Sequence, residues 1–130
     1  MSIVKIWTKP LNPTIHSKKL RKNIMAGAYV SFEGWVRQWN KGKKVKELHY
    51  EAYTPMAIKE IKKIIDKAKK EFSVLDIHVH HRTGTLQLGE IAVWMGVTGE
   101  HRKECFKACE YVIAELKKQA PIWKEERITL

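Results

Sequence analysis

Apolar and polar residues alternate with a period of two in several stretches of the chain, which is the pattern of a half-buried β-strand. The stretches that predict strands are residues 3–7, 27–37, 43–53, 74–82 and 90–97. Asn40, Lys41 and Gly42 supply turn-forming residues between the second and third of these strands. We therefore expect the strands 27–37 and 43–53 to pair as a hairpin.

Apolar residues recur at spacings of three and four elsewhere, which predicts helices. Asn12 and Pro13 are a suitable N-cap and first position for a short basic helix that ends near Asn23. Thr54 as cap and Pro55 as first residue begin a second helix in the same way. Its predicted buried stripe consists of Ile58, Ile61, Ile65, Ala68 and Phe72.

A third helix is predicted to begin at Glu100 and to end before Pro121, which cannot continue it. Its predicted buried stripe consists of Phe106, Cys109, Ile113 and Leu116. Strands and helices in this mixed order predict an α+β fold. A length of 130 residues fits one domain, which we expect to cover residues 1–130.

The composition is that of a globular protein, with 44% hydrophobic and 30% charged residues. No run of about 18 or more apolar residues is present, and the first residues lack the features of a secretory signal. We therefore expect a cytoplasmic protein with no membrane partner. Cys105 and Cys109 are expected to be buried thiols, because a spacing of four along a helix does not suit a disulfide.

The chain carries a strong positive charge, since 25 Lys and Arg residues stand against 14 Asp and Glu residues and give +11. Such a charge attracts anions but does not specify which ones. A nucleic-acid-binding module is the main alternative from another functional class, because basic residues interspersed with aromatic residues are typical of it. The chain contains no RNP, KH or helix-turn-helix signature, so we expect no nucleic-acid partner.

Three consecutive cations, His101, Arg102 and Lys103, occupy the first turn of the third helix. The helix dipole disfavours cations there unless an anion is bound. Free backbone N–H groups and these side chains together would form a phosphate or carboxylate site. The alternative is three solvated side chains on a first turn that frays.

Basic residues also gather where the third helix ends. Lys117 and Lys118 are ordinary complements of the helix dipole at a C-terminus. Lys124 is more informative, because the neighbouring Trp123 should anchor the segment and fix the direction of the lysine.

His78, His80 and His81 lie at the end of a predicted strand, with His78 and His80 on one face. No cysteine or carboxylate stands at ligand spacing beside them, so we expect no metal site. The chain also has no Gly-rich phosphate loop, no Gly-x-Ser-x-Gly motif and no Cys-x-x-Cys motif, and we expect no cofactor.

Four segments carry a resemblance to a known family. They are Gly27 to Arg37; Leu48 to Tyr53 with Met56-Ala57; His81-Arg82-Thr83-Gly84 leading to Leu88-Gly89-Glu90; and His101-Arg102 through Ala108-Cys109 to Lys117 and Pro121-Ile122-Trp123-Lys124. Each is weak alone, but their order and spacing resemble the large, catalytic subunits of molybdopterin synthase, the MoaE family. The resemblance covers nearly the whole chain.

This resemblance implies an α/β hammerhead fold with an additional antiparallel sheet, and a homodimer at the centre of a heterotetramer. It implies a sulfurtransferase in molybdenum cofactor biosynthesis. The partner would be a small ubiquitin-like sulfur carrier whose C-terminal Gly-Gly thiocarboxylate enters the active site. The substrate would be cyclic pyranopterin monophosphate, which receives two sulfur atoms to become molybdopterin.

The family's site residues carry over to named positions of this chain. Its catalytic lysine falls on Lys117 and its second essential lysine on Lys124. Its anion-binding arginine falls on Arg37, and its His-Arg pair on His101 and Arg102, which in relatives comes from the other protomer. A non-catalytic scaffold with the same fold is the second alternative, although every one of these positions holds the residue type of the family.

Overall fold

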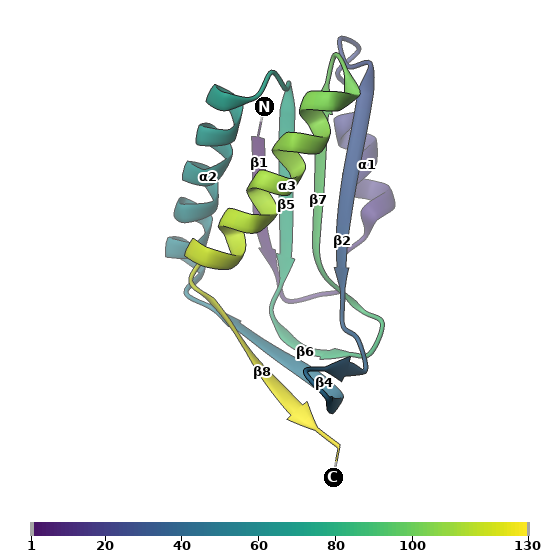
Figure 1. Cartoon of the computed structure of the whole chain (residues 1–130), viewed down its shortest axis with the longest axis vertical. Coiled ribbons are helices and arrows are strands. Elements are labelled where there is room, and N and C mark those ends of the chain that lie inside the picture. The colour runs from purple at the N-terminus through teal and green to yellow at the C-terminus, as the bar shows by residue number, and fades with distance from the viewer. Residues whose placement is uncertain (1, 130) are drawn as a thin grey trace.

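A four-stranded sheet forms the frame of the molecule (Figure 1). The computed structural model describes residues 2–129, and the strands of this sheet are, in spatial order, β1 (Ser2–Trp7), β5 (Asp76–Arg82), β7 (Ile91–Gly99) and β2 (Ala28–Trp35). β1 runs parallel to β5, whereas the other neighbours are antiparallel. β2 therefore forms one edge of the sheet.

Two long helices, α2 (Thr54–Glu71) and α3 (Arg102–Gln119), cover one face of this sheet, and the short helix α1 (Pro13–Leu20) lies on the other (Figure 1). The main core lies between the sheet and the two long helices. Its fully buried members include Ile61, Ile65, Val79, Val97 and Val112. Burial of such side chains stabilises the fold by roughly 1.5–3 kcal/mol each.

A second, antiparallel sheet extends below the first (Figure 1). Its longest strand, β4 (Lys43–Ala52), pairs with β3 (Trp39–Asn40), β6 (Gly84–Gln87) and β8 (Ile122–Ile128). A smaller apolar cluster supports this sheet, formed by Val36, Val45, Leu48, Leu86 and Ala92. The predicted α+β fold with an additional antiparallel sheet is therefore confirmed.

The predicted hairpin between residues 27–37 and 43–53 is wrong. β2 pairs with β7 along its whole length, because its apolar residues are needed in the main core. Only the two-residue strand β3 pairs with the start of β4. The predicted turn itself does form, since Lys41 and Gly42 both have positive φ angles, of 51° and 77°.

The helix boundaries agree with the sequence in part. Asn12 caps α1 as predicted and accepts a hydrogen bond from the backbone of Ile15, but the helix ends at Leu20 and does not continue to Asn23. α2 begins one residue earlier than predicted, with Tyr53 as its N-cap and Thr54 as its first residue. Within residues 2–129, no helix is long and apolar enough to cross a membrane.

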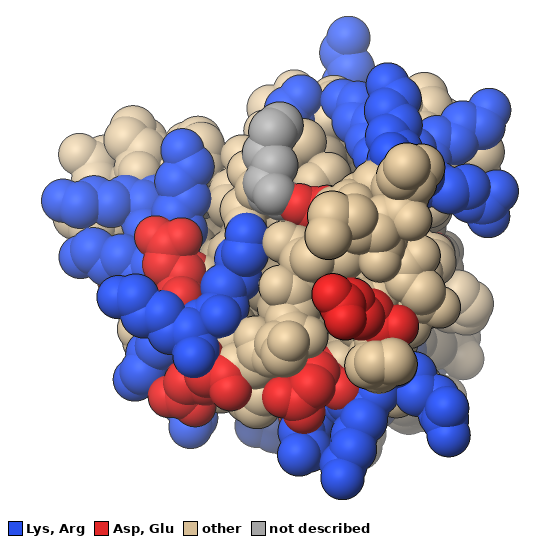
Figure 2. All heavy atoms as spheres, turned by 90° about the horizontal axis from the view of Figure 1, so that it is seen from above, with Lys and Arg blue, Asp and Glu red and all other residues tan. Residues whose placement is uncertain are grey.

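Positive charge is spread over the surface. The solvent side of α2 carries a run of lysines. The buried side of this helix consists of Ala57, Ile61, Ile64, Ile65 and Ala68. Seen from above, Lys and Arg side chains project in separate groups from several sides of the molecule (Figure 2). On this face the cations form no single continuous stripe of the kind that tracks a nucleic-acid backbone.

Histidines fill the narrow space between α1 and the sheet. The His16 and His80 rings stack with centroids 3.7 Å apart, and Trp7 Nε1 donates a hydrogen bond of 2.8 Å to His80 Nδ1. Burial lowers the pKa of His78 to about 4 and that of His80 to about 3. The cluster is therefore neutral when the protein is folded at physiological pH.

We predict that this cluster makes the protein sensitive to acid. An unfolded histidine has a pKa near 6.5, so the folded state binds fewer protons, and stability is complete above about pH 6.5 and falls as the pH drops towards 4. His78→Gln should reduce this pH dependence by up to about 1.4 kcal/mol per pH unit between about pH 6 and pH 4.5. Urea unfolding of both proteins between pH 8 and pH 4.5 measures the difference; identical slopes would contradict the prediction.

Candidate active site

A cavity of about 710 Å³ lies where the lower ends of β2 and β7 meet the end of α3 and the second sheet. Cations from three separate segments line it: Arg37 after β2, Lys117 in α3 and Lys124 in β8. Three of the five predicted site residues are therefore brought together. The other polar side chains in the lining include Glu33, Asn40, Tyr50, His81 and Glu126.

The two lysines are positioned by regular secondary structure. Lys117 belongs to the last turn of α3, where a cation complements the helix dipole, and follows Leu116, which is buried. In β8, alternation places Ile122, Lys124 and Glu126 in the lining of the cavity. Both lysine side chains are exposed, so they are available to a ligand.

Arg37 is held by a chain of hydrogen bonds. Its Nη2 donates to Asn40 Oδ1 at 3.1 Å, and Asn40 Nδ2 donates to Glu126 Oε1 at 2.8 Å. Asn40 of the short strand β3 therefore links Arg37 to Glu126 of β8. One N–H group of Arg37 is therefore engaged by Asn40, while the remaining N–H groups of the guanidinium can bind an anion.

His81 and Tyr50 form the inner wall of the cavity. Their rings pack edge to face with centroids 5.1 Å apart. The His81 Nδ1 atom lies 2.8 Å from the backbone oxygen of Arg82. Burial raises the pKa of Tyr50 and lowers that of His81, so both side chains are neutral at physiological pH.

Sequence reasoning did not identify Tyr50, His81 or Glu126 as site residues. For His81 the signal was available, because alternation along β5 places it opposite to His78 and His80, on the face covered by α3. Tyr50 and Glu126 line the cavity only because β4 and β8 are neighbours, with Tyr50 paired to Lys124. That long-range pairing had no signal in the local sequence.

His101 and Arg102 lie at the opposite end of α3 from Lys117. His101 is the N-cap and Arg102 the first residue of the helix, and both side chains are exposed. Fifteen residues of helix separate Arg102 from Lys117, which corresponds to roughly 22 Å. Within one chain, the structure therefore does not bring this pair to the cavity.

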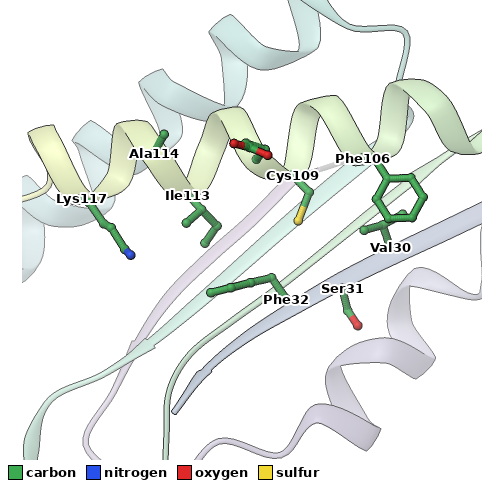
Figure 3. A pocket seen from close by; sticks show the side chains of 9 residues that line it. Val30, Ser31, Phe32, Phe106, Cys109, Ile113, Ala114 and Lys117 are labelled. Carbon is green, nitrogen blue, oxygen red and sulfur yellow. The ribbon is translucent and has the colours of Figure 1, made fainter. Parts of the chain in front are cut away.

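A second cavity, of about 520 Å³, lies between β2 and α3 and is mostly apolar (Figure 3). Phe106, Cys109 and Ile113 of α3 point towards β2, where Val30 and Phe32 lie on the facing side and Ser31 points away. The predicted burial of Phe106 is wrong, since its side chain is 60% exposed. The buried stripe of α3 is instead Cys105, Ala108, Cys109, Val112 and Leu116, which confirms both cysteines as buried thiols.

The histidines do not form a metal site. Among residues 2–129, no group of three or more His, Cys, Asp or Glu side chains is arranged to hold a metal ion. His78 and His80 are buried beside α1, whereas His81 faces the cavity. Three cations and the two carboxylates Glu33 and Glu126 therefore line the cavity, and each carboxylate already accepts a hydrogen bond from the protein, so the cations remain available to a negatively charged ligand.

Comparison with known proteins shows which proteins this chain is similar to. The model of the family described as MoaE protein matches residues 6–119. The molybdopterin synthase catalytic subunit of Thermoplasma volcanium is 42% identical over 95% of this chain and 89% of its own length. Among solved structures, molybdopterin synthase from Staphylococcus aureus has a TM-score of 0.88 at 38% identity, covering 95% of this chain and 90% of that one.

A third relative was solved as a protein–protein complex. It is the complex of subunits 1 and 2 of the molybdopterin-converting factor from Helicobacter pylori 26695, with a TM-score of 0.80 at 25% identity, covering 96% of this chain and 84% of that one.

The α+β fold and these relatives together define a sulfur-transferring enzyme subunit. The chain belongs to the MoaE family, the catalytic subunits of molybdopterin synthase in molybdenum cofactor biosynthesis.

We predict that Asn40→Ala weakens anion binding in this cavity. Loss of the bridging amide frees Arg37, and one hydrogen bond of this kind corresponds to about a two- to tenfold change in affinity. Calorimetric titration with pyrophosphate measures the effect. Gln38→Ala is the matched control, because Gln38 is an exposed residue of the same segment and does not line the cavity. Equal affinities of the two variants would contradict the role of Asn40.

Proposed function

We propose that the cavity is the site of sulfur transfer from a carrier thiocarboxylate to cyclic pyranopterin monophosphate. The observation that carries the proposal is the convergence of Arg37, Lys117 and Lys124 from three elements on one cavity. Both reactants are anions, because one has a thiocarboxylate and the other a phosphate. The +11 charge of the chain favours their approach.

The partner would be a small ubiquitin-like sulfur-carrier subunit. The relative from Helicobacter pylori forms a complex between its two subunits, which supports a small-subunit partner for this chain as well. A Gly-Gly terminus has no side chains beyond Cα and is conformationally free, which suits entry into a cavity of about 710 Å³. The exposed Trp35 and Trp39 stand close to the cavity lining and offer large apolar contacts for such a partner.

Each cation has a separate role in this proposal. The Lys117 ammonium lies beside the carbonyl of the thiocarboxylate and stabilises the negative charge that develops on its oxygen during transfer. Lys124 orients the pterin, and Arg37 binds the phosphate together with His101 and Arg102. This arrangement holds the two anions side by side, where their mutual repulsion would otherwise keep them apart.

The His101–Arg102 pair would come from a second copy of the chain. β2 and α3 begin together, because Gly27 N donates a hydrogen bond of 2.9 Å to Gly99 O, and both then run towards the cavity (Figure 1). A two-fold axis across this face reverses the α3 of the second copy. Its first turn then lies beside Lys117 of the first copy.

The face that this axis would cover has the properties of an interface. It contains the apolar cavity between β2 and α3, and Phe106 in the lining of this cavity is 60% exposed. Exposed aromatic residues next to an apolar cavity are typical of a surface that a partner covers. β2 also has one unpaired edge within the described sheet, and a second β2 strand can satisfy it.

We predict that Lys117→Ala lowers sulfur transfer by about 100-fold or more, because it removes the charge that stabilises the transition state. Carrier affinity should stay nearly unchanged. The assay is dithiolene formation from the pterin monophosphate with thiocarboxylated carrier, together with calorimetric binding of the carrier.

Lys118→Ala is the matched control, since Lys118 lies on the same helical turn, pairs with Glu115 and does not line the cavity. It should change turnover by no more than about twofold. Loss of carrier binding in Lys117→Ala with normal turnover at saturating carrier would overturn the assignment. Carrier binding by the parent without any turnover would favour the non-catalytic scaffold.

We predict complementation between two inactive variants if the site is shared. A dimer of one Lys117→Ala chain and one Arg102→Ala chain has one site with both defects and one site with neither, so purified mixed dimers should regain about half of the parent activity. Two different affinity tags isolate the mixed dimers. If both residues served the same site within one chain, the mixed dimers would contain no intact site and would stay inactive.

A further inference from the structure

His81 is a buried polar residue of the cavity, and the proposed sulfur transfer assigns it no role. It is 5% exposed and lines the same cavity as Lys117 and Lys124. Alternation along β5 separates it from His78 and His80, which fill the space under α1 on the other face. A buried histidine on the face of the active site requires its own explanation.

The proton of the His81 ring can be assigned from its neighbour. Nδ1 lies 2.8 Å from the backbone oxygen of Arg82, and a carbonyl oxygen only accepts hydrogen bonds. Nδ1 therefore carries the hydrogen, and in the neutral ring Nε2 carries a lone pair. Burial lowers the pKa of His81 and so favours this neutral form, while the bond to Arg82 works in the opposite direction.

Tyr50 fixes the plane of the imidazole. The two rings pack edge to face with centroids 5.1 Å apart, and Tyr50 is itself held in β4 by its pairing with Lys124 of β8. The direction of the Nε2 lone pair is thus set by two strands, β5 and β4, and by one backbone bond. Such a fixed acceptor is suited to orienting a ligand.

The two carboxylates of the cavity each already accept one hydrogen bond from the protein. Glu33 accepts a bond from Trp35 Nε1 at 2.8 Å, and Glu126 accepts the bond from Asn40 at 2.8 Å. The three cations can only donate. Within residues 2–129, the hydrogen bond of the His81 ring is made by Nδ1, and no protein group bonds to Nε2.

We propose that Nε2 of His81 accepts a hydrogen bond from an N–H group of the pterin ring and so orients the substrate in the cavity. The proposal rests on the proposed function, because it takes the pterin monophosphate as the ligand. The three cations can bind the phosphate and the thiocarboxylate, but they cannot accept a hydrogen bond from the N–H groups of a pterin. A neutral imidazole provides one without adding a negative charge that would pair with Lys117 or Lys124.

Nitrogen NMR of the ¹⁵N-histidine-labelled protein, in complex with its carrier, tests the tautomer and the contact directly. His81 should show a protonated Nδ1 and an unprotonated Nε2, and the Nε2 signal should shift when the pterin monophosphate is added. The His81→Gln variant identifies the signals of His81. The opposite tautomer, or an Nε2 signal that the substrate does not change, would overturn the proposal.

Steady-state kinetics provide the second test. His81→Leu leaves a buried N–H of the substrate without an acceptor, so the KM for the pterin should rise about tenfold while kcat changes by less than about threefold. His81→Gln should restore much of the affinity, because its amide oxygen can accept in place of Nε2. His49→Leu is the matched control, since His49 binds Thr85 and does not line the cavity.

The role of His81 and the proposed function can each be overturned separately. If the parent protein turns over and Lys117→Ala does not, an unchanged KM in His81→Leu would overturn the role of His81 alone. If the parent protein does not turn over, the proposed function fails, and the NMR titration with the pterin monophosphate still decides whether His81 binds it.

Discussion

The packing of α3 along β2 and β7 is the interaction on which the active site depends. Cys105, Ala108 and Val112 are fully buried and fix the rotation of the helix about its axis, because any turn would expose them. This rotation places Lys117 on the side that faces the cavity, directly after the buried Leu116. The same rigid helix carries Arg102 at its other end, so one packing arrangement sets the positions of both groups.

Because a single helix cannot deliver both of its ends to one cavity, we propose a second copy of the chain as the source of the His101–Arg102 pair. The alternative would be a flexible segment that folds back over roughly 22 Å, and ordering it would cost about 1–2 kcal/mol per residue. A symmetric dimer avoids that cost, because each helix serves its own cavity with one end and the neighbouring cavity with the other. The unfavourable placement of cations at a helix start is then offset by the bound phosphate.

Local pattern predicted most of the elements but not their long-range pairing. The cap at Asn12, the turn at Lys41–Gly42 and the strand character of residues 27–37 depend on neighbouring residues, and the structure has them. The pairing of β2 with β7, and of β4 with β8, depends on which apolar face needs covering, and the sequence carried no local signal for it. Tyr50 and Glu126 were missed for this reason. The prediction for Phe106 failed for another reason. Its apolar character and helical spacing predict burial but not what would bury it, and within the single chain the side chain is exposed.

The three histidines of β5 illustrate how a period of two divides chemistry between the faces of a sheet. His78 and His80 face α1, where stacking with His16 and a bond from Trp7 give them a structural role. His81 comes one residue later and therefore faces α3 and the cavity. The same physical effect, burial, keeps the rings on both faces neutral. On one face neutrality allows aromatic rings to pack closely, whereas on the other it leaves a lone pair among cations, where a substrate N–H can use it.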